Sequence, residues 1–228
     1  MPTKAATYTL TASAPGYGNG LFSETATPGT AKTLARVSGN LQTATVTTTL
    51  PTPLVSVARD QYNNAVPGVS VSFTDNGAGG TFSANPVMTN SKGQAIVSYT
   101  ASTKAATVTI FAKVTGLPQL KFTETVKAGP AASIVVASGN NQTAPPSTPL
   151  SLPLGVSVKD QYANPVSGAA VTFSDGASGG SFSANPVTTA ANGSASVIYT
   201  TPSNSGIVTI DATVNGVPAG ATFTVTVQ

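Results

Sequence analysis

The chain has 228 residues, of which 40% are hydrophobic and only 7% charged, and its net charge is +3. It contains no histidine and no cysteine, which excludes a histidine general base, disulfide bonds and the ordinary zinc, haem and iron–sulfur sites. The lysines and arginines form no basic run, so we expect no nucleic acid partner. No stretch of about 20 apolar residues is present, so we expect no membrane span in this chain.

One long stretch of sequence occurs twice. The 28 residues that begin DQYNNAVPG at Asp60 align without a gap with those that begin DQYANPVSG at Asp160, and 17 positions are identical. The motif SGN at Ser38 returns at Ser138, again 100 residues later. A solenoid unit has about 20 to 50 residues, so a period of this length predicts that each copy is a whole domain.

The sequence predicts two full copies, residues 30–128 and 129–228, and a shorter segment before them. The segment TYTLTASAPGYGNGLFSETATPG, from Thr7, aligns without a gap with TVTIFAKVTGLPQLKFTETVKAG, from Thr107. We therefore predict that residues 1–29 are the C-terminal strands of a preceding, partial repeat. The sequence leaves open whether they are a fragment of a longer array or strands donated to a neighbouring molecule.

Hydrophobic residues alternate with serine and threonine through copy one, and this is the period of a half-buried β-strand. In VSVSFT, for example, Val69, Val71 and Phe73 face one way and the hydroxyl residues face the other. No stretch has helical periodicity. The predicted strands of copy one lie near residues 32–37, 44–48, 53–59, 69–74, 80–83, 94–101, 106–114 and 120–127, and those of copy two follow 100 residues later.

The last predicted strand of copy one is the least regular. Glu124 stands between Phe122 and Val126, at a position where the alternation calls for an apolar residue.

Prolines mark the ends of several strands, because proline cannot donate a hydrogen bond to a ladder. Pro51, Pro53 and residues 145–149 are therefore predicted to lie at an edge or in a connection. Short strands separated by turns over roughly 100 residues are typical of an Ig-like sandwich. The predicted fold class is all-β, made of tandem Ig-like antiparallel β-sandwiches.

Both copies carry a pattern of strands and turns that is known from one family. Copy one has VSVARDQYNNAVPGVSVSFT, a glycine-rich loop and TNSKGQAIVSYTASTKAATVTIFAKVTG. Copy two has VSVKDQYANPVSGAAVTFS and ANGSASVIYTTPSNSGIVTIDATVNG. These motifs resemble the bacterial Ig-like domains of group 1, the invasin/intimin type. The resemblance implies an exported bacterial protein, extracellular or at the cell surface, whose repeats act mainly as stalk and spacer.

The strongest repeated polar pair is Asp60 with Asn64, which returns as Asp160 with Asn164. Side-chain oxygens of this kind bind Ca²⁺, so the four residues are calcium candidates. The alternative is structural: the aspartate accepts backbone N–H bonds and fixes the turn after the strand. Each loop has one carboxylate and Ca²⁺ takes about six to eight oxygens, so we favour the structural alternative and expect no metal.

Other candidate residues also indicate structure rather than catalysis. The loops DNGAGG and DGASGG have glycines but lack the lysine and the helix of a phosphate loop, so we expect turns there. Asp60 and Asp75 end neighbouring strand segments, but no repeated base or nucleophile accompanies them. We expect no catalytic residue, no cofactor and no enzyme activity. Four tyrosines are interpreted as partly buried core residues: Tyr62, Tyr99, Tyr162 and Tyr199.

Three functions remain open at this point. The first is a structural spacer of an exported surface or adhesin-like protein, with short Pro/Gly linkers that favour a semi-rigid array. The second is a subunit of an extracellular filament, assembled when the N-terminal strands with Tyr8, Leu10 and Phe22 add to a neighbour's sheet. The third is a carbohydrate- or protein-binding module, which the lack of tryptophan disfavours.

The expected partners are neighbouring Ig-like domains of the same or an identical chain. The resemblance also leaves a host or cell-surface receptor open. The first residues, MPTKAATYTL, lack the long apolar core of a signal peptide, so for an exported protein we expect the signal to lie outside this chain.

Overall fold

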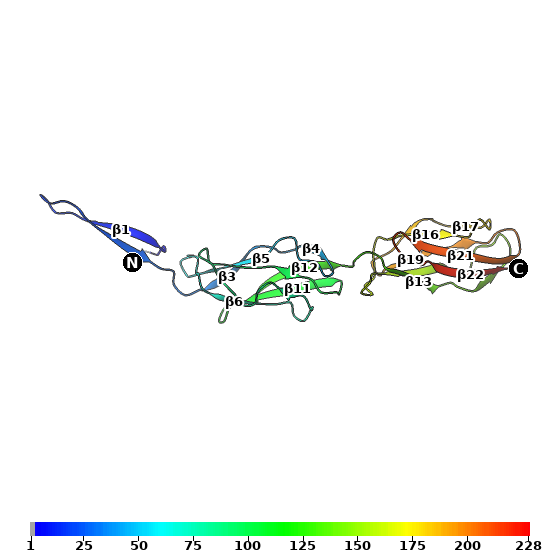
Figure 1. Cartoon of the computed structure of the whole chain (residues 1–228), viewed down its shortest axis with the longest axis horizontal. Helices are drawn as coiled ribbons and strands as arrows, with labels where there is room; N and C mark the ends of the chain where they lie inside the picture. Colours follow the sequence, from blue (N-terminus) through cyan, green and yellow to red (C-terminus); the bar gives the residue numbers. More distant parts are fainter. Residues whose placement is uncertain (1–2) are drawn as a thin grey trace. The chain divides into compact units, whose positions relative to one another are not determined.

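The computed structural model describes residues 3–228, and its regular elements are all β-strands (Figure 1). The chain divides into two compact units, residues 1–126 and 127–228. The first unit holds an N-terminal hairpin and copy one, and the second holds copy two. From residue 3 onward, no helix is present that could serve as a membrane span.

The N-terminal hairpin consists of β1 (Ala6–Ala12) and β2 (Gly20–Ala26), which pair antiparallel as a separate two-stranded sheet. Leu10 lies opposite Phe22 in this pair. The two side chains are 54% and 58% exposed, so the hairpin has an apolar face that the described part of the chain leaves open to solvent.

Copy one folds into two facing sheets and a short ribbon. The first sheet has the order β4-β12-β11-β6-β8, the second has the order β3-β5-β9, and β10 pairs with β7. The strands are β3 (Thr33–Ser38), β4 (Thr43–Thr45), β5 (Leu54–Arg59), β6 (Ser70–Thr74), β7 (Thr81–Phe82), β8 (Val87–Met88), β9 (Gln94–Val97), β10 (Tyr99–Thr100), β11 (Ala106–Lys113) and β12 (Leu120–Lys127).

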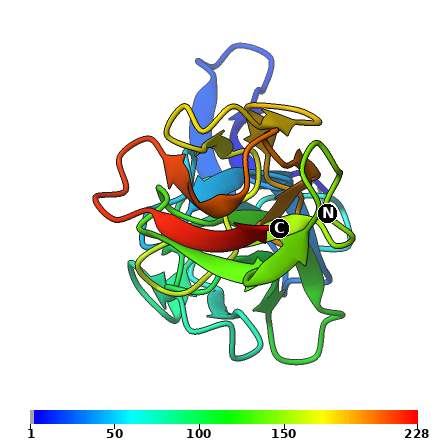
Figure 2. The ribbon, with the colours of Figure 1, turned by 90° about the vertical axis from the view of Figure 1, so that its right-hand side faces the viewer.

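Copy two repeats this architecture, with the sheet orders β14-β22-β21-β16-β18 and β13-β15-β19 and the ribbon β17-β20. Figure 2 shows its closing strand β22 (red) in front, with the C-terminus at its end. The strands are β13 (Ser133–Ser138), β14 (Gln142–Ala144), β15 (Leu154–Lys159), β16 (Ala170–Ser174), β17 (Ser181–Phe182), β18 (Val187–Thr188), β19 (Ser194–Val197), β20 (Tyr199–Thr200), β21 (Gly206–Val214) and β22 (Ala221–Val227).

The structure confirms the all-β fold and every predicted strand of copy one, with three differences. The run near 94–101 is two strands, because the chain leaves the β5 sheet after Val97 and pairs with β7 from Tyr99. Strand β8, which contains two residues, was not predicted. In the last strand the spacing between the copies is 101 residues instead of the predicted 100, because Ile110 pairs with Phe122 whereas Ile210 pairs with Phe223.

The predicted proline positions hold. Pro51 and Pro53 lie in the connection between β4 and β5, and residues 145–149 lie between β14 and β15. Apart from the bridge of Pro149 to Thr200, these prolines pair with no strand.

Alternate residues of the facing strands fill the core of each copy. In copy one, Val71, Phe73, Ile110 and Phe122 are all buried, and their neighbours along each strand are exposed or half-buried. Full burial of a side chain of this size contributes about 1.5–3 kcal/mol, so the alternation supplies most of the driving force for folding. The outward faces of the strands carry mainly serine and threonine, which accounts for the low charge of the chain.

A buried tyrosine closes one end of each sandwich. The Tyr99 hydroxyl donates to Oδ2 of Asp75 at 3.0 Å, and the Gly80 N–H donates to the same oxygen at 2.8 Å. Burial, with the Asp75 carboxylate next to it, raises the pKa of Tyr99 well above its ordinary value. A Cβ at Gly80 would overlap the Tyr99 ring, so only glycine fits. Copy two repeats the arrangement with Asp175, Gly180 and Tyr199.

Glu124 is buried in the core of copy one, only 1% exposed, although its side chain is an acid. Its Oε2 accepts the Gln42 N–H at 2.7 Å, but its Oε1 has no partner, and neither has the buried hydroxyl of Ser56. Burial raises the pKa of Glu124 to about 7. Copy two has Val156 and Val225 at the corresponding positions, so the unpaired polar atoms are specific to copy one.

The first prediction concerns Gly80→Ala. This variant should lower the free energy of unfolding of copy one by about 2–3 kcal/mol, because the added methyl overlaps Tyr99 in a packed core. Thermal or denaturant unfolding followed residue by residue by NMR would measure it, with copy two as internal reference. Gly18→Ala is the control, since a Cβ there meets nothing within 4 Å. An unchanged free energy of unfolding of copy one would contradict the role assigned to Tyr99.

The second prediction concerns Glu124→Gln. The pKa of Glu124 is about 7 in the folded chain and ordinarily 4.5, so folding favours the protonated acid. Copy one therefore keeps this stability below pH 4.5 and loses it as the pH rises to 7. After allowance for solvent screening, Glu124→Gln should stabilise copy one at pH 8 by about 1–2 kcal/mol relative to pH 4. Unfolding curves of the variant and the original chain at both pH values test this. If the two chains differ in their free energy of unfolding by the same amount at pH 4 and at pH 8, the prediction is refuted.

Candidate functional site

The repeated Asp-Gln-Tyr turn follows directly after β5. One carboxylate oxygen of Asp60, Oδ1, accepts the N–H groups of Tyr62 and Asn64, both at 2.9 Å. These bonds close the turn, in which Asn63 has a φ of 67°. The Asp60 carboxylate therefore fixes the backbone at the end of the strand, in the way that the structural alternative describes.

The second oxygen of Asp60 reaches beyond the turn. Oδ2 accepts the Gly29 N–H and the Asn64 side-chain amide, both at 2.9 Å. The amide of Asn64, and then the N–H groups of Gly29, Asn64 and Tyr62, lower the pKa of Asp60 to about 2 against the opposing effect of burial. The carboxylate thus stays ionised, and its four N–H donors tie the linker before copy one to the turn.

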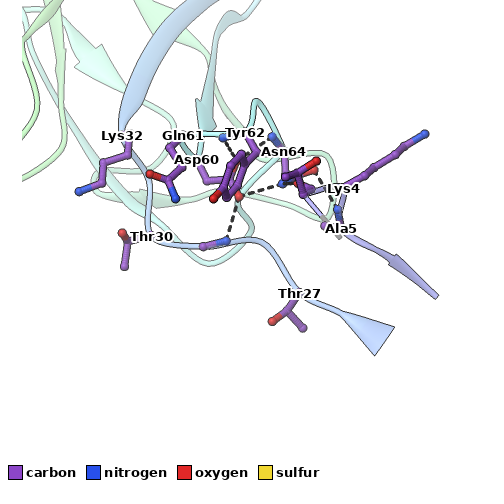
Figure 3. A pocket seen from close by; sticks show the side chains of 11 residues that line it. Lys4, Ala5, Thr27, Thr30, Lys32, Asp60, Gln61, Tyr62 and Asn64 are labelled. Atoms are coloured by element: carbon purple, nitrogen blue, oxygen red, sulfur yellow. Dashed lines mark hydrogen bonds between the residues drawn. The ribbon is translucent and has the colours of Figure 1, made fainter. Parts of the chain in front are cut away.

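Asn64 extends the same network to the hairpin. Its Oδ1 accepts the Ala5 N–H at 2.9 Å, and its Nδ2 also donates to the carbonyl oxygen of Thr3 at 2.8 Å. Figure 3 shows the side chains of Asp60 and Asn64 side by side, with these bonds running to the start of β1 and to the linker. We call the set Asp60, Asn64, Gly29, Thr3 and Ala5 the junction clamp. It holds the backbone on both sides of the hairpin.

The junction clamp was found only in part from the sequence. Asp60 and Asn64 were selected because they repeat, but their partners at residues 3, 5 and 29 are backbone groups, which no residue type reveals.

Copy two has the same turn. Asp160 Oδ1 accepts the N–H groups of Tyr162 and Asn164, and Oδ2 accepts the Gly129 N–H, all at 2.9 Å. Burial opposes ionisation of Asp160, but the Asn164 amide and the three N–H groups outweigh it and lower the pKa of this carboxyl. The doubled aspartate therefore fixes the start of each copy to its own turn.

The geometry of the turns favours hydrogen bonding over calcium. Both oxygens of Asp60 and of Asp160 already accept N–H donors, whereas a calcium site needs several oxygens aimed at one point. Among residues 3–228, no group of three or more acidic, histidine or cysteine side chains could hold a metal ion.

A polar hollow of about 310 Å³ lies beside the junction clamp (Figure 3). Tyr62 lines it and is 56% exposed, and Tyr162 is 39% exposed, so the interpretation of these two tyrosines as core residues is wrong. Tyr99 and Tyr199 are fully buried, more deeply than predicted.

Figure 3 shows the amino groups of Lys4 and Lys32, which line the same hollow, directed away from Asp60. The hollow is lined by hydroxyl, amide and ammonium groups and by the Asp60 carboxylate, whose oxygens already accept hydrogen bonds from the chain.

Asn85 is a second repeated residue, which the sequence indicates as a turn residue without revealing its hydrogen bonds. The Asn85 side chain accepts the Phe73 N–H at 2.8 Å and donates to the Phe73 carbonyl at 2.7 Å. Asn185 makes the same two hydrogen bonds to the backbone of Phe173. The sequence FSANPV, which is identical in both copies, was the signal that could have pointed to this asparagine.

The third prediction concerns Asn64→Ala. It removes the bonds to Thr3 and Ala5, so amide exchange at Ala5 should accelerate at least tenfold, and copy one should lose about 1–2 kcal/mol. Hydrogen exchange followed by NMR measures both effects. Gln61→Ala is the matched control, because Gln61 is exposed in the same turn. Equal exchange in the two variants would show that Asn64 does not hold the hairpin.

Comparison with known families matches each copy separately. Residues 51–128 match the family described as bacterial Ig-like domain (group 1), and residues 150–228 match the family described as invasin, domain 3. No curated protein matches the chain.

Two solved structures share the fold. The chain is 21% identical to the Escherichia coli adhesin FdeC, with a TM-score of 0.54, over 89% of this chain and 68% of that one. It is 18% identical to InvD of Yersinia pseudotuberculosis, with a TM-score of 0.55, over 86% of this chain and 57% of that one. At these identities, the two structures show that the fold is shared. Residues 51–128 belong to the bacterial Ig-like domains of group 1, and residues 150–228 belong to the family of invasin domain 3.

Proposed function

We propose that this chain is a load-bearing spacer of a bacterial adhesin-like protein, located at the cell surface or outside the cell. The observation that carries the proposal is the pairing of an early strand with the last strand of each copy. In copy two, β14 runs parallel to β22, with Gln142 opposite Val225 and Ala144 opposite Val227. In copy one, β4 is the neighbour of β12, and the Thr125 N–H donates to the Gln42 carbonyl at 2.9 Å.

Parallel pairing of this kind suits a domain that is pulled at its two ends. Strand β14 lies near the start of copy two, and β22 closes it. When the ends are pulled apart, the two strands slide along each other, so their ladder bonds are loaded together. Strands that are peeled from one end break their bonds one after another, at lower force.

The arrangement of polar groups also supports a mechanical role. The repeated aspartates bind backbone N–H groups rather than facing a common cavity, and the repeated tyrosines are bound by Asp75 and Asp175. Within this proposal, residues 30–128 and 129–228 are two complete spacers, and residues 1–29 are the last strands of another repeat. The match to FdeC, which is described as an adhesin, supports the surface location.

The fourth prediction tests the spacer proposal by force spectroscopy on copy two. The chain has no cysteine, so handles can be placed by substitution. In the Ala132→Cys/Gln228→Cys pair, force enters at the two ends of the copy and shears β14 against β22. In the Ile207→Cys/Gln228→Cys pair, force unzips β21 from β22, because Ile207 lies opposite Thr226 beside the C-terminus.

We expect the end-to-end pair to unfold at the higher force, with an extension of about 300 Å for the released chain. An end-to-end force equal to or below the unzipping force would contradict the load-bearing role.

A further inference from the structure

The hairpin β1–β2 has the same register as the last hairpin of copy one. Leu10 pairs with Phe22 as Ile110 pairs with Phe122. The sequences correspond residue for residue around these positions. Ile110 and Phe122 are completely buried, whereas Leu10 and Phe22 are 54% and 58% exposed. The hairpin therefore has the inward face of an Ig-like sheet without the opposite sheet that covers it.

The position of this hairpin within a complete copy defines what is missing. In copy one, β11 and β12 are neighbours in a sheet of order β4-β12-β11-β6-β8, so β4 and β6 bond their outer edges. The second sheet, β3-β5-β9, covers their apolar face. In residues 3–228, β1 and β2 pair only with each other. A β4-like strand, a β6-like strand and a facing sheet would complete them.

An intact copy cannot supply these elements. In copies one and two, the place between the β4-like and β6-like strands is already filled, by β11–β12 and by β21–β22. Adding the hairpin to a sheet edge would pair one of its strands but would leave the face of Leu10 and Phe22 uncovered. The partner must therefore have the earlier strands of a repeat and lack its last hairpin.

We infer that the face of β1–β2 containing Leu10 and Phe22 binds the remainder of an Ig-like repeat of this type, equivalent to strands β3–β10, and becomes its two central strands. The choice of partner rests on the proposed repeat array. The binding itself does not depend on the load-bearing role, and the force measurement on copy two does not involve the hairpin.

The experiment places residues 30–102 of copy one ahead of Thr3. The junction is seamless, because the letters TKAAT follow Ser102 in copy one and also begin at Thr3. Amide hydrogen exchange of Leu10 and Phe22 is measured by NMR in this extended chain and in the original one. Protection should rise at least 100-fold, towards that of Ile110 and Phe122.

Two variants of the extended chain separate specific docking from a general effect. Leu10→Asp should abolish the gain in protection, because its side chain faces the new core. Leu21→Asp should keep the gain, because Leu21 lies opposite Thr11 on the other face of the hairpin. If both variants keep it, or both lose it, the proposed face is wrong.

Two further outcomes overturn the inference. One is that amide exchange of Leu10 and Phe22 stays unchanged in two extended chains, one with residues 30–102 and the other with residues 130–202 of copy two placed ahead of Thr3. The second chain is included in case the first added segment fails to fold. The other is concentration-dependent protection of Leu10 in the original chain, which would make a second intact copy the partner.

Discussion

The carboxylate of Asp60 is the interaction on which the start of copy one depends. It accepts four N–H donors: two from its own turn, one from the linker at Gly29 and one from the amide of Asn64. Asn64 in turn holds backbone groups at the base of the hairpin. Asp60 thus fixes the turn after β5 and the linker that follows the hairpin, and Asn64 fixes the chain that precedes the hairpin. Asp160 provides the same turn and linker bonds in copy two.

The doubled sequence encodes a framework whose polar residues are bound internally. Asp75 holds Tyr99, and Asn85 brackets the backbone of Phe73, and both arrangements recur in copy two. The cores of the two copies differ at two polar positions: Ser56 and Glu124 have unpaired buried atoms, whereas copy two has valines at both positions. Copy one therefore combines the same fold with a buried acid in its core.

Alternation and turn residues were sufficient to predict the sandwich, because a strand with one buried face has period 2. The same rule made β12 look weak, since Glu124 occupies an inward position that burial normally denies to an acid. Tyr62 and Tyr99 could not be told apart by residue type. Only the fold shows that Tyr99 meets Asp75, whereas Tyr62 is exposed beside the linker. The junction clamp was hidden for a related reason, because its partners are backbone atoms.

The most direct test of the framework account is the titration of the Asp60 carboxyl carbon by ¹³C NMR, with and without calcium. If the carboxylate serves only the N–H donors of the junction clamp, its shift should stay constant from pH 7 to pH 4, move with a midpoint near a pKa of about 2, and ignore added Ca²⁺. A midpoint near the ordinary value of 3.8, together with a calcium-dependent shift, would contradict the account and restore the turn as a metal site.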